Sequence, residues 1–153
     1  PPERIRIIDA SGDALEGRTT PIDEGSDVIV SCIAIAGNPL PIVRWFHNGK
    51  EIDSDSSLDA DNVTVRNTLH LFTLSRDYFE TVLFCEAEHK LYPHPVNASI
   101  LIDMNLKPLY VKIEKSWRSL VAGQKAELVC RSFGSRPPAV LTWIKGEEKL
   151  LDS

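Results

Sequence analysis

Short segments in which apolar and polar residues alternate are the main pattern in this chain. In the clearest one, residues 28–34, the side chains of Val28, Val30, Cys32 and Ala34 would share one face of an extended strand. Further predicted strands lie at 5–8, 42–46, 68–74, 82–88, 96–102, 110–113, 125–131 and 140–144. Because a period of two is typical of half-buried strands, the pattern predicts an all-β protein.

Residues that strands tolerate poorly separate these segments. Residues 37–41 include two prolines, which lack the backbone donor that a central strand needs. Asn48 and Gly49 accept positive φ and predict a tight hairpin. Tyr92–Pro95 is a predicted turn, and Asn105–Leu109 is a predicted elbow between two domains.

A frame of glycine, cysteine and tryptophan occurs twice. In each copy the glycine precedes the cysteine by seven residues, and the tryptophan follows the cysteine by 13. The copies are Gly25, Cys32 and Trp45, and Gly123, Cys130 and Trp143. The offset of 98 residues matches the length of an immunoglobulin domain, about 100 residues.

In that sandwich a cysteine of one sheet is bridged to a cysteine of the other, and the tryptophan packs against the bridge. We therefore predict a disulfide between Cys32 and Cys85, with Trp45 in the core of the first domain and Trp143 in the core of the second. A bridge that closes so long a loop contributes on the order of 4 kcal/mol in the chain-entropy account.

The predicted fold is an immunoglobulin-like β-sandwich of the C2 or I type, with one complete domain and the N-terminal half of a second in tandem. The complete domain spans residues 1–103, the elbow 104–109 and the half domain 110–153. The chain has three cysteines. We expect the partner of Cys130 to lie outside it.

Charge is distributed unevenly between the two parts. Residues 1–103 carry 8 basic and 17 acidic side chains, and residues 104–153 carry 9 and 5. The acidic first part does not favour nucleic acid, which needs a basic surface. The basic second part is interpreted as a solvated face, with a site for a sulfated glycan or an acidic protein as the alternative.

The sequence has no stretch of about 18 apolar residues, the length that a membrane helix needs. We expect an extracellular segment at the cell surface because the predicted disulfide is typical of secreted proteins, and the transmembrane segment that holds it at the plasma membrane would lie outside this chain.

Two asparagines fit the acceptor pattern for N-linked glycans. They are Asn62, followed by Val63 and Thr64, and Asn97, followed by Ala98 and Ser99. Asn62 falls in a polar loop, whereas Asn97 falls at the start of the last predicted strand of the first domain. We expect both to carry glycans.

Phe46 and Phe84 are predicted to point outward, because each is the sequence neighbour of an inward residue, Trp45 or Cys85. Since their strands are neighbours in this fold, the two rings would lie on one exposed face. Exposed aromatics often anchor protein partners. The alternative is a surface pair covered by aliphatic stems or by a glycan.

No pattern in the sequence indicates catalysis or a cofactor. The acidic run formed by Asp53, Asp55, Asp59 and Asp61 lacks the glycine and the distal glutamate of a calcium loop, so we interpret it as solvated. The four histidines are not at ligand spacing, and no nucleophile stands beside a base. We expect a non-enzymatic protein without metal or cofactor.

Several motifs carry a family resemblance. The first part of the chain resembles the second immunoglobulin domain of the Sidestep family of insect cell-surface receptors. The likeness lies in Pro1–Asp9, Asp23–Asp27 and Trp45–Gly49. Asn105–Leu109 and the run from Cys130 to Trp143 resemble the start of the third domain of that family. Nephrin-like and nectin-like adhesion molecules share similar runs and are the near alternative.

The resemblance implies a neuronal receptor that binds Beaten path proteins, which are also immunoglobulin proteins, in axon guidance and synaptic partner choice. It also implies that a domain preceding this segment makes the main contact. The alternatives are that these domains act as a structural spacer, or as a homophilic or heterophilic adhesion module of the nephrin or nectin type.

One position departs from the general immunoglobulin pattern. The residue two before the second cysteine is usually a tyrosine whose hydroxyl bonds back to the chain, but here it is Leu83. The corner before this strand must then be held by other contacts, for which Asp77 is a candidate.

Overall fold

The computed structural model describes residues 4–114 and 121–150, so the outer residues of the predicted domains and the segment 115–120 lie outside the description. The chain divides into two compact units, Pro1–Met104 and Asn105–Ser153.

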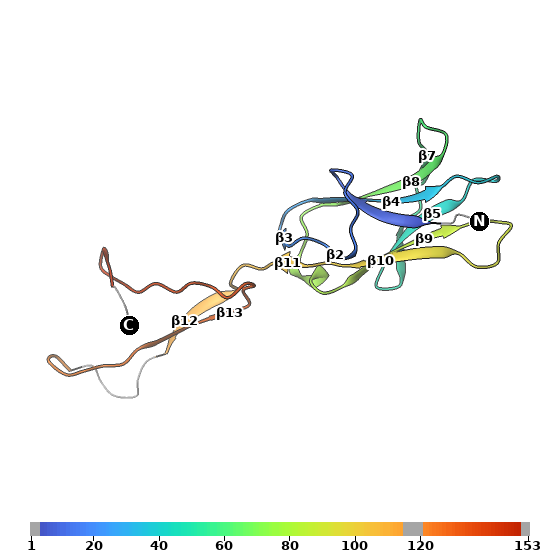
Figure 1. Ribbon diagram of the computed structural model, residues 1–153. Helices are drawn as coiled ribbons and strands as arrows, with labels where there is room; N and C mark the ends of the chain where they lie inside the picture. The colour runs from blue at the N-terminus through green and yellow to red at the C-terminus, as the bar shows by residue number, and fades with distance from the viewer. Residues whose placement is uncertain (1–3, 115–120, 151–153) are drawn as a thin grey trace. The chain divides into compact units, whose positions relative to one another are not determined.

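The first unit is a sandwich of two sheets (Figure 1). The four-stranded sheet has the order β1 (Ile5–Asp9), β4 (Val28–Ile35), β8 (Thr64–Leu71), β7 (Ser57–Leu58). The five-stranded sheet has the order β2 (Gly17–Arg18), β10 (Val96–Leu101), β9 (Val82–Glu88), β5 (Ile42–His47), β6 (Lys50–Asp53). Short strands β3 (Ile22–Asp23) and β11 (Met104–Asn105) pair with each other. The predicted immunoglobulin-like fold is confirmed.

The alternation in the sequence becomes the two faces of each sheet. Within β4 the side chains of Val30, Cys32 and Ala34 are buried, and within β9 those of Leu83 and Cys85. The predicted Cys32–Cys85 disulfide is present and joins the two sheets, with 6.3 Å between the Cα atoms. Loss of this apolar surface from water is the main force that holds the sheets together.

Trp45 fills the space beside the disulfide and is fully buried, with 0% exposure. Its indole Nε1 donates a hydrogen bond of 3.0 Å to the backbone carbonyl of Asn67 on the opposite sheet. A buried indole N–H needs such an acceptor, so β8 fixes the orientation of the ring.

One strand of the first unit was placed inaccurately from the sequence. Strand β8 spans Thr64–Leu71, whereas the alternation predicted residues 68–74. The pairing of β4 with β8 runs from Val28 opposite Leu71 to Ile35 opposite Thr64. The length of β8 is therefore set by its neighbour, which local alternation does not reveal.

The hairpin between β5 and β6 forms as predicted, with positive φ at Asn48 and at Gly49. The corner before β9 is a 3-10 turn, η1 (Arg76–Tyr78). The ring of Tyr78 stacks on that of His47, with centroids 4.3 Å apart. The hydroxyl of Thr81 donates to the Tyr78 carbonyl at 2.6 Å and lies 2.9 Å from His47 Nε2.

These contacts supply the support that the absent tyrosine would give. The Thr81 hydroxyl donates its one proton in the bond to the Tyr78 carbonyl, so it must accept in its bond with His47. Nε2 of His47 is therefore the donor in that bond. Asp77, the candidate from the sequence, is exposed, and the contacts just described come instead from His47, Tyr78 and Thr81.

In the described part of the second unit, the strands form two antiparallel pairs. Strand β12 (Tyr110–Glu114) pairs with β13 (Val129–Phe133), and β14 (Ile144–Lys145) pairs with β15 (Glu148–Lys149). The prediction of a strand over 140–144 was wrong for residues 140–143. A strand needs a neighbour for its backbone groups, and here Glu148–Lys149 supplies one only to Ile144 and Lys145.

Candidate functional site: the outward face of the five-stranded sheet

Phe46 and Phe84 lie directly opposite each other on strands β5 and β9. Their rings meet edge to face, with centroids 5.8 Å apart and an angle of 70° between the planes. Both side chains are half-buried, whereas the neighbouring Trp45 and Cys85 are enclosed in the core. The structure thus brings together the two aromatics that the sequence placed on one face.

A charged cluster borders this aromatic pair on the same face. Arg44 lies between two carboxylates, with Nη1 2.8 Å from Oε2 of Glu88 and Nε 3.3 Å from Oε1 of Glu51. Because all three side chains are substantially exposed, these ion pairs contribute little to stability. They orient the Arg44 guanidinium along the sheet, where it is accessible to a partner.

The acceptor asparagine Asn97 also lies on this face. In the β10–β9 ladder, Asn97 is opposite Glu86, and Ser99 is opposite Phe84. Asn97 and Ser99 are exposed, whereas Ile100 on the alternate side of β10 is buried. The acceptor sequence therefore runs along the strand next to the aromatic pair, a juxtaposition that sequence spacing alone did not reveal.

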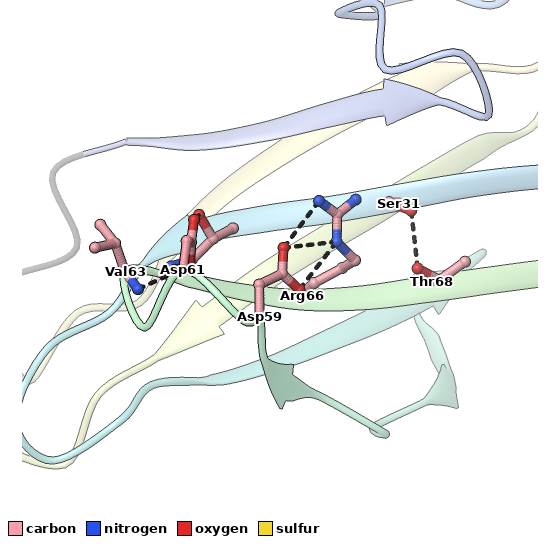
Figure 2. A network of polar contacts seen from close by, with 7 residues as sticks. Ser31, Asp59, Asp61, Val63, Arg66 and Thr68 are labelled. Carbon is pink, nitrogen blue, oxygen red and sulfur yellow. Dashed lines mark hydrogen bonds and ion pairs between the residues drawn. The ribbon is translucent and has the colours of Figure 1, made fainter.

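A polar network lies on the outer face of the four-stranded sheet (Figure 2), beside the exposed side chains of Ile29 and Ile35. The Ser31 and Thr68 hydroxyls bond across β4 and β8 at 2.9 Å. The Arg66 guanidinium makes a two-point contact with Asp59, with Nε and Nη2 3.1 and 3.0 Å from Oδ2. This network ties the turn before β8 to its own strand.

Asn62 sits at the tip of that turn with φ of 57° and is exposed. The carboxylate of Asp61 accepts the backbone N–H groups of Val63 and Thr64 and the Thr64 hydroxyl, the last at 2.7 Å. These bonds, led by the one from Val63, lower the pKa of Asp61 below its ordinary value. The turn that presents Asn62 is therefore well defined.

The acidic run has structural partners at several positions. Asp53 accepts a hydrogen bond from the Asn67 amide at 3.2 Å, Asp59 pairs with Arg66, and Asp61 closes its turn. Within residues 4–114 and 121–150, no three His, Cys, Asp or Glu side chains converge in a way that could hold a metal ion.

The functional residues predicted for the second unit lie in more open surroundings. Trp143 is half-buried and immediately precedes β14, and Cys130 on β13 is a free, half-buried thiol. Every residue of β12 is exposed.

Asn67 was not singled out from the sequence. It lies on β8 between the buried residues Val65 and Leu69, and it is itself 0% exposed. Its Nδ2 donates to the Val43 carbonyl at 3.0 Å and so joins the two sheets. The only available signal was its position in an alternating strand, where an inward asparagine implies a specific partner.

Comparisons with known proteins agree with this architecture. The model of the immunoglobulin domain family matches residues 15–89. Mouse cell adhesion molecule 1 is 26% identical over 83% of this chain and 28% of its own length. Rat cell adhesion molecule 2 is 28% identical over 90% of this chain and 33% of its own length. The chain thus contains a segment, residues 15–89, that matches the immunoglobulin domain family, and it is similar to cell adhesion molecules over about a third of their length.

Solved structures show the same fold. The ectodomain of mouse nectin-like molecule 4, with three immunoglobulin domains, matches with a TM-score of 0.63 and 22% identity over 99% of this chain and 50% of that one. The first two domains of Rst match with a TM-score of 0.52 and 19% identity over 68% of this chain and 49% of that one. Among the described residues, no helix has the length and apolar composition to cross a membrane.

Proposed function

We propose that this chain is an extracellular segment of a neuronal cell-surface receptor that binds another immunoglobulin protein through the outward face of its five-stranded sheet. The observation that carries the proposal is the half-buried Phe46–Phe84 pair, with Arg44 beside it. Aromatic and arginine side chains are the residues that most often dominate the energy of protein interfaces.

The extracellular location rests on two observations. The Cys32–Cys85 disulfide is of a kind that persists in oxidising compartments, such as the cell exterior. The curated relatives are cell adhesion molecules, which supports attachment at the plasma membrane. N-linked glycans on Asn62 and Asn97 are supported by the acceptor patterns in the sequence. Both are proposals for this chain.

The resemblance to the Sidestep family supplies the partner class, the Beaten path proteins, and the role in axon guidance and synaptic partner recognition. The similarity to cell adhesion molecules favours a second candidate, homophilic or heterophilic adhesion of the nectin type. Both use the same chemistry at the sheet face, and they differ in the identity of the partner.

A binding screen tests the proposal. The secreted chain is measured against Beaten path ectodomains and against itself, as wild type and as Phe84→Glu. We expect the charged side chain to weaken binding at least tenfold, because it places a carboxylate in a desolvated contact. The matched control is Phe72→Glu. Phe72 is 73% exposed and directly follows β8, which belongs to the four-stranded sheet, so it lies away from the proposed binding face.

Thermal unfolding of both variants verifies that the fold is intact, and Phe84→Ser provides a second, smaller change at the same position. Equal binding by wild type and both Phe84 variants would show that the sheet face does not bind the partner. That result would favour the alternative that these domains act as a structural spacer. Binding to itself alone would select the adhesion candidate.

A further inference from the structure

The acceptor asparagine and the aromatic pair lie on three consecutive strands of one sheet face. Ser99 on β10 is opposite Phe84 on β9, and Phe84 is opposite Phe46 on β5. Asn97 is two residues from Ser99 on β10, so it is a diagonal neighbour of Phe84. Diagonal neighbours in a sheet are separated by about 7–8 Å, which long side chains span.

The side of Phe84 that faces β10 carries little cover. Its direct neighbour there is Ser99, a small side chain that is itself exposed. On the other side, Phe46 makes the edge-to-face contact with the Phe84 ring. A sugar joined to the amide of Asn97 extends that side chain by the length of a pyranose ring, which is enough to reach Phe84.

The chemistry of the two groups is complementary. A pyranose ring has a face of C–H groups, and packing that face on an aromatic ring removes apolar surface of both from water. The hydroxyls at the rim of the sugar stay in solvent. A glycan on Asn97 would therefore be a covalently attached occupant within reach of this half-buried aromatic surface.

We propose that the N-linked glycan of Asn97 packs on the Phe84–Phe46 pair and so controls the access of protein partners to this face. The packing depends on the chain's own residues alone. The control of access rests on the proposed function of the sheet face.

Asn62 is the matched comparison within the same chain. It lies in the turn between β7 and β8 of the other sheet, where Asp61 and Thr64 hold the turn through a bond of 2.7 Å. A glycan on Asn62 would start from the four-stranded sheet, whereas Phe84 and Phe46 belong to the β10–β9–β5 ladders of the other sheet. It is expected to leave the aromatic pair uncovered.

The first experiment tests the packing without any partner. The glycoprotein is produced as wild type and as Phe84→Ser, and mass spectrometry establishes the occupancy of Asn97. Two forms of each protein are then unfolded thermally. One carries glycans trimmed to a single sugar, and the other carries Asn97→Gln and so lacks the sugar at that position. We expect the sugar to raise the Tm of wild type by about 3 °C, the shift for a modest contact in a domain of this size.

In Phe84→Ser the same sugar is expected to leave the Tm unchanged, because its aromatic neighbour is gone. Removal of the other acceptor by Asn62→Gln is expected to have an equal effect in both backgrounds. An unoccupied Asn97, or an equal rise of Tm in wild type and Phe84→Ser, overturns the proposal.

The second experiment measures binding to the partner found in the screen described above. Asn97→Gln is expected to bind at least tenfold more tightly than the fully glycosylated wild type, whereas Asn62→Gln binds as wild type does. Equal affinity with and without the Asn97 glycan overturns the control of access. If no form binds any protein, the proposed function of the face fails, and the thermal comparison alone decides whether the glycan packs on the rings.

Discussion

The two units carry the same frame of glycine, cysteine and tryptophan, but only the first encloses it. Trp45 is fully buried, and Cys32 is bridged to Cys85. Trp143 is half-buried, and the thiol of Cys130 is free. Equal local spacing therefore leads to different environments.

The difference lies in what stands opposite each frame. In the first unit, β9 supplies Cys85, and β8 supplies the carbonyl of Asn67 for the Trp45 indole. In the described part of the second unit, Val140 is 94% exposed and every residue of β12 is open to solvent. A frame indicates where a core forms, and the burial itself comes from residues far away in the sequence.

The largest expected effect separates the two tryptophans. Trp45→Ala removes a fully enclosed side chain and is expected to lower the free energy of unfolding by about 4 kcal/mol, as for other large core truncations. Trp143→Ala is the matched control, with an expected loss below about 1 kcal/mol because it leaves a site that is already open. Urea unfolding followed by circular dichroism measures both, and similar losses would remove the distinction between the units.

The cysteines sharpen the same comparison. Cys85→Ala opens the disulfide and is expected to cost about 4 kcal/mol, because the unfolded chain regains the freedom that the bridge removed. Cys130→Ala changes a free thiol and is expected to leave the midpoint of urea unfolding nearly unchanged. A larger loss for Cys130→Ala than for Cys85→Ala would show that the thiol has a role in the fold.

A smaller effect is expected at the buried amide of the first unit. Asn67→Ala leaves the Val43 carbonyl without its 3.0 Å donor and is expected to cost about 2 kcal/mol. Thr68→Ala is the control on the same strand, since it removes an outward hydroxyl whose part-buried bond to Ser31 stays within one sheet. If the two variants unfold at the same urea concentration, the amide does not hold the sheets together.

The smallest expected effect is a dependence on pH at the corner of the first unit. Burial lowers the pKa of His47 below its ordinary value of 6.5. The folded protein then binds a proton less readily than the unfolded chain, so stability is full above pH 6.5 and declines as the pH falls below it. His47→Gln is expected to reduce the difference in Tm between pH 7.5 and pH 5.5, two values chosen on either side of about 6.5. An unchanged difference would place the acid sensitivity elsewhere.

Much of the first unit was predictable, because the alternation of apolar and polar residues in each strand indicates which side chains point into the core. Strand β9 has the predicted bounds, Val82–Glu88, and the hairpin at Asn48 and Gly49 forms as expected. The bounds of β8 and the absence of a strand at 140–143 were not predictable, since strand pairing decides both: β8 follows the distant β4, whereas Glu148–Lys149 pairs only with Ile144 and Lys145.

The sequence by itself determined the fold class, the disulfide and the outward direction of Phe46 and Phe84. All of these follow from residue spacing and from the period of a strand. Only the tertiary structure decided that Asn97 lies beside Phe84, that Asn67 joins the two sheets, and that His47 supports the corner before β9. These residue pairs are 13 to 34 positions apart in the sequence. The ladder between β10 and β9 places Asn97 near Phe84, and the packing of the two sheets brings Asn67 to Val43, so a linear pattern carries no signal for them.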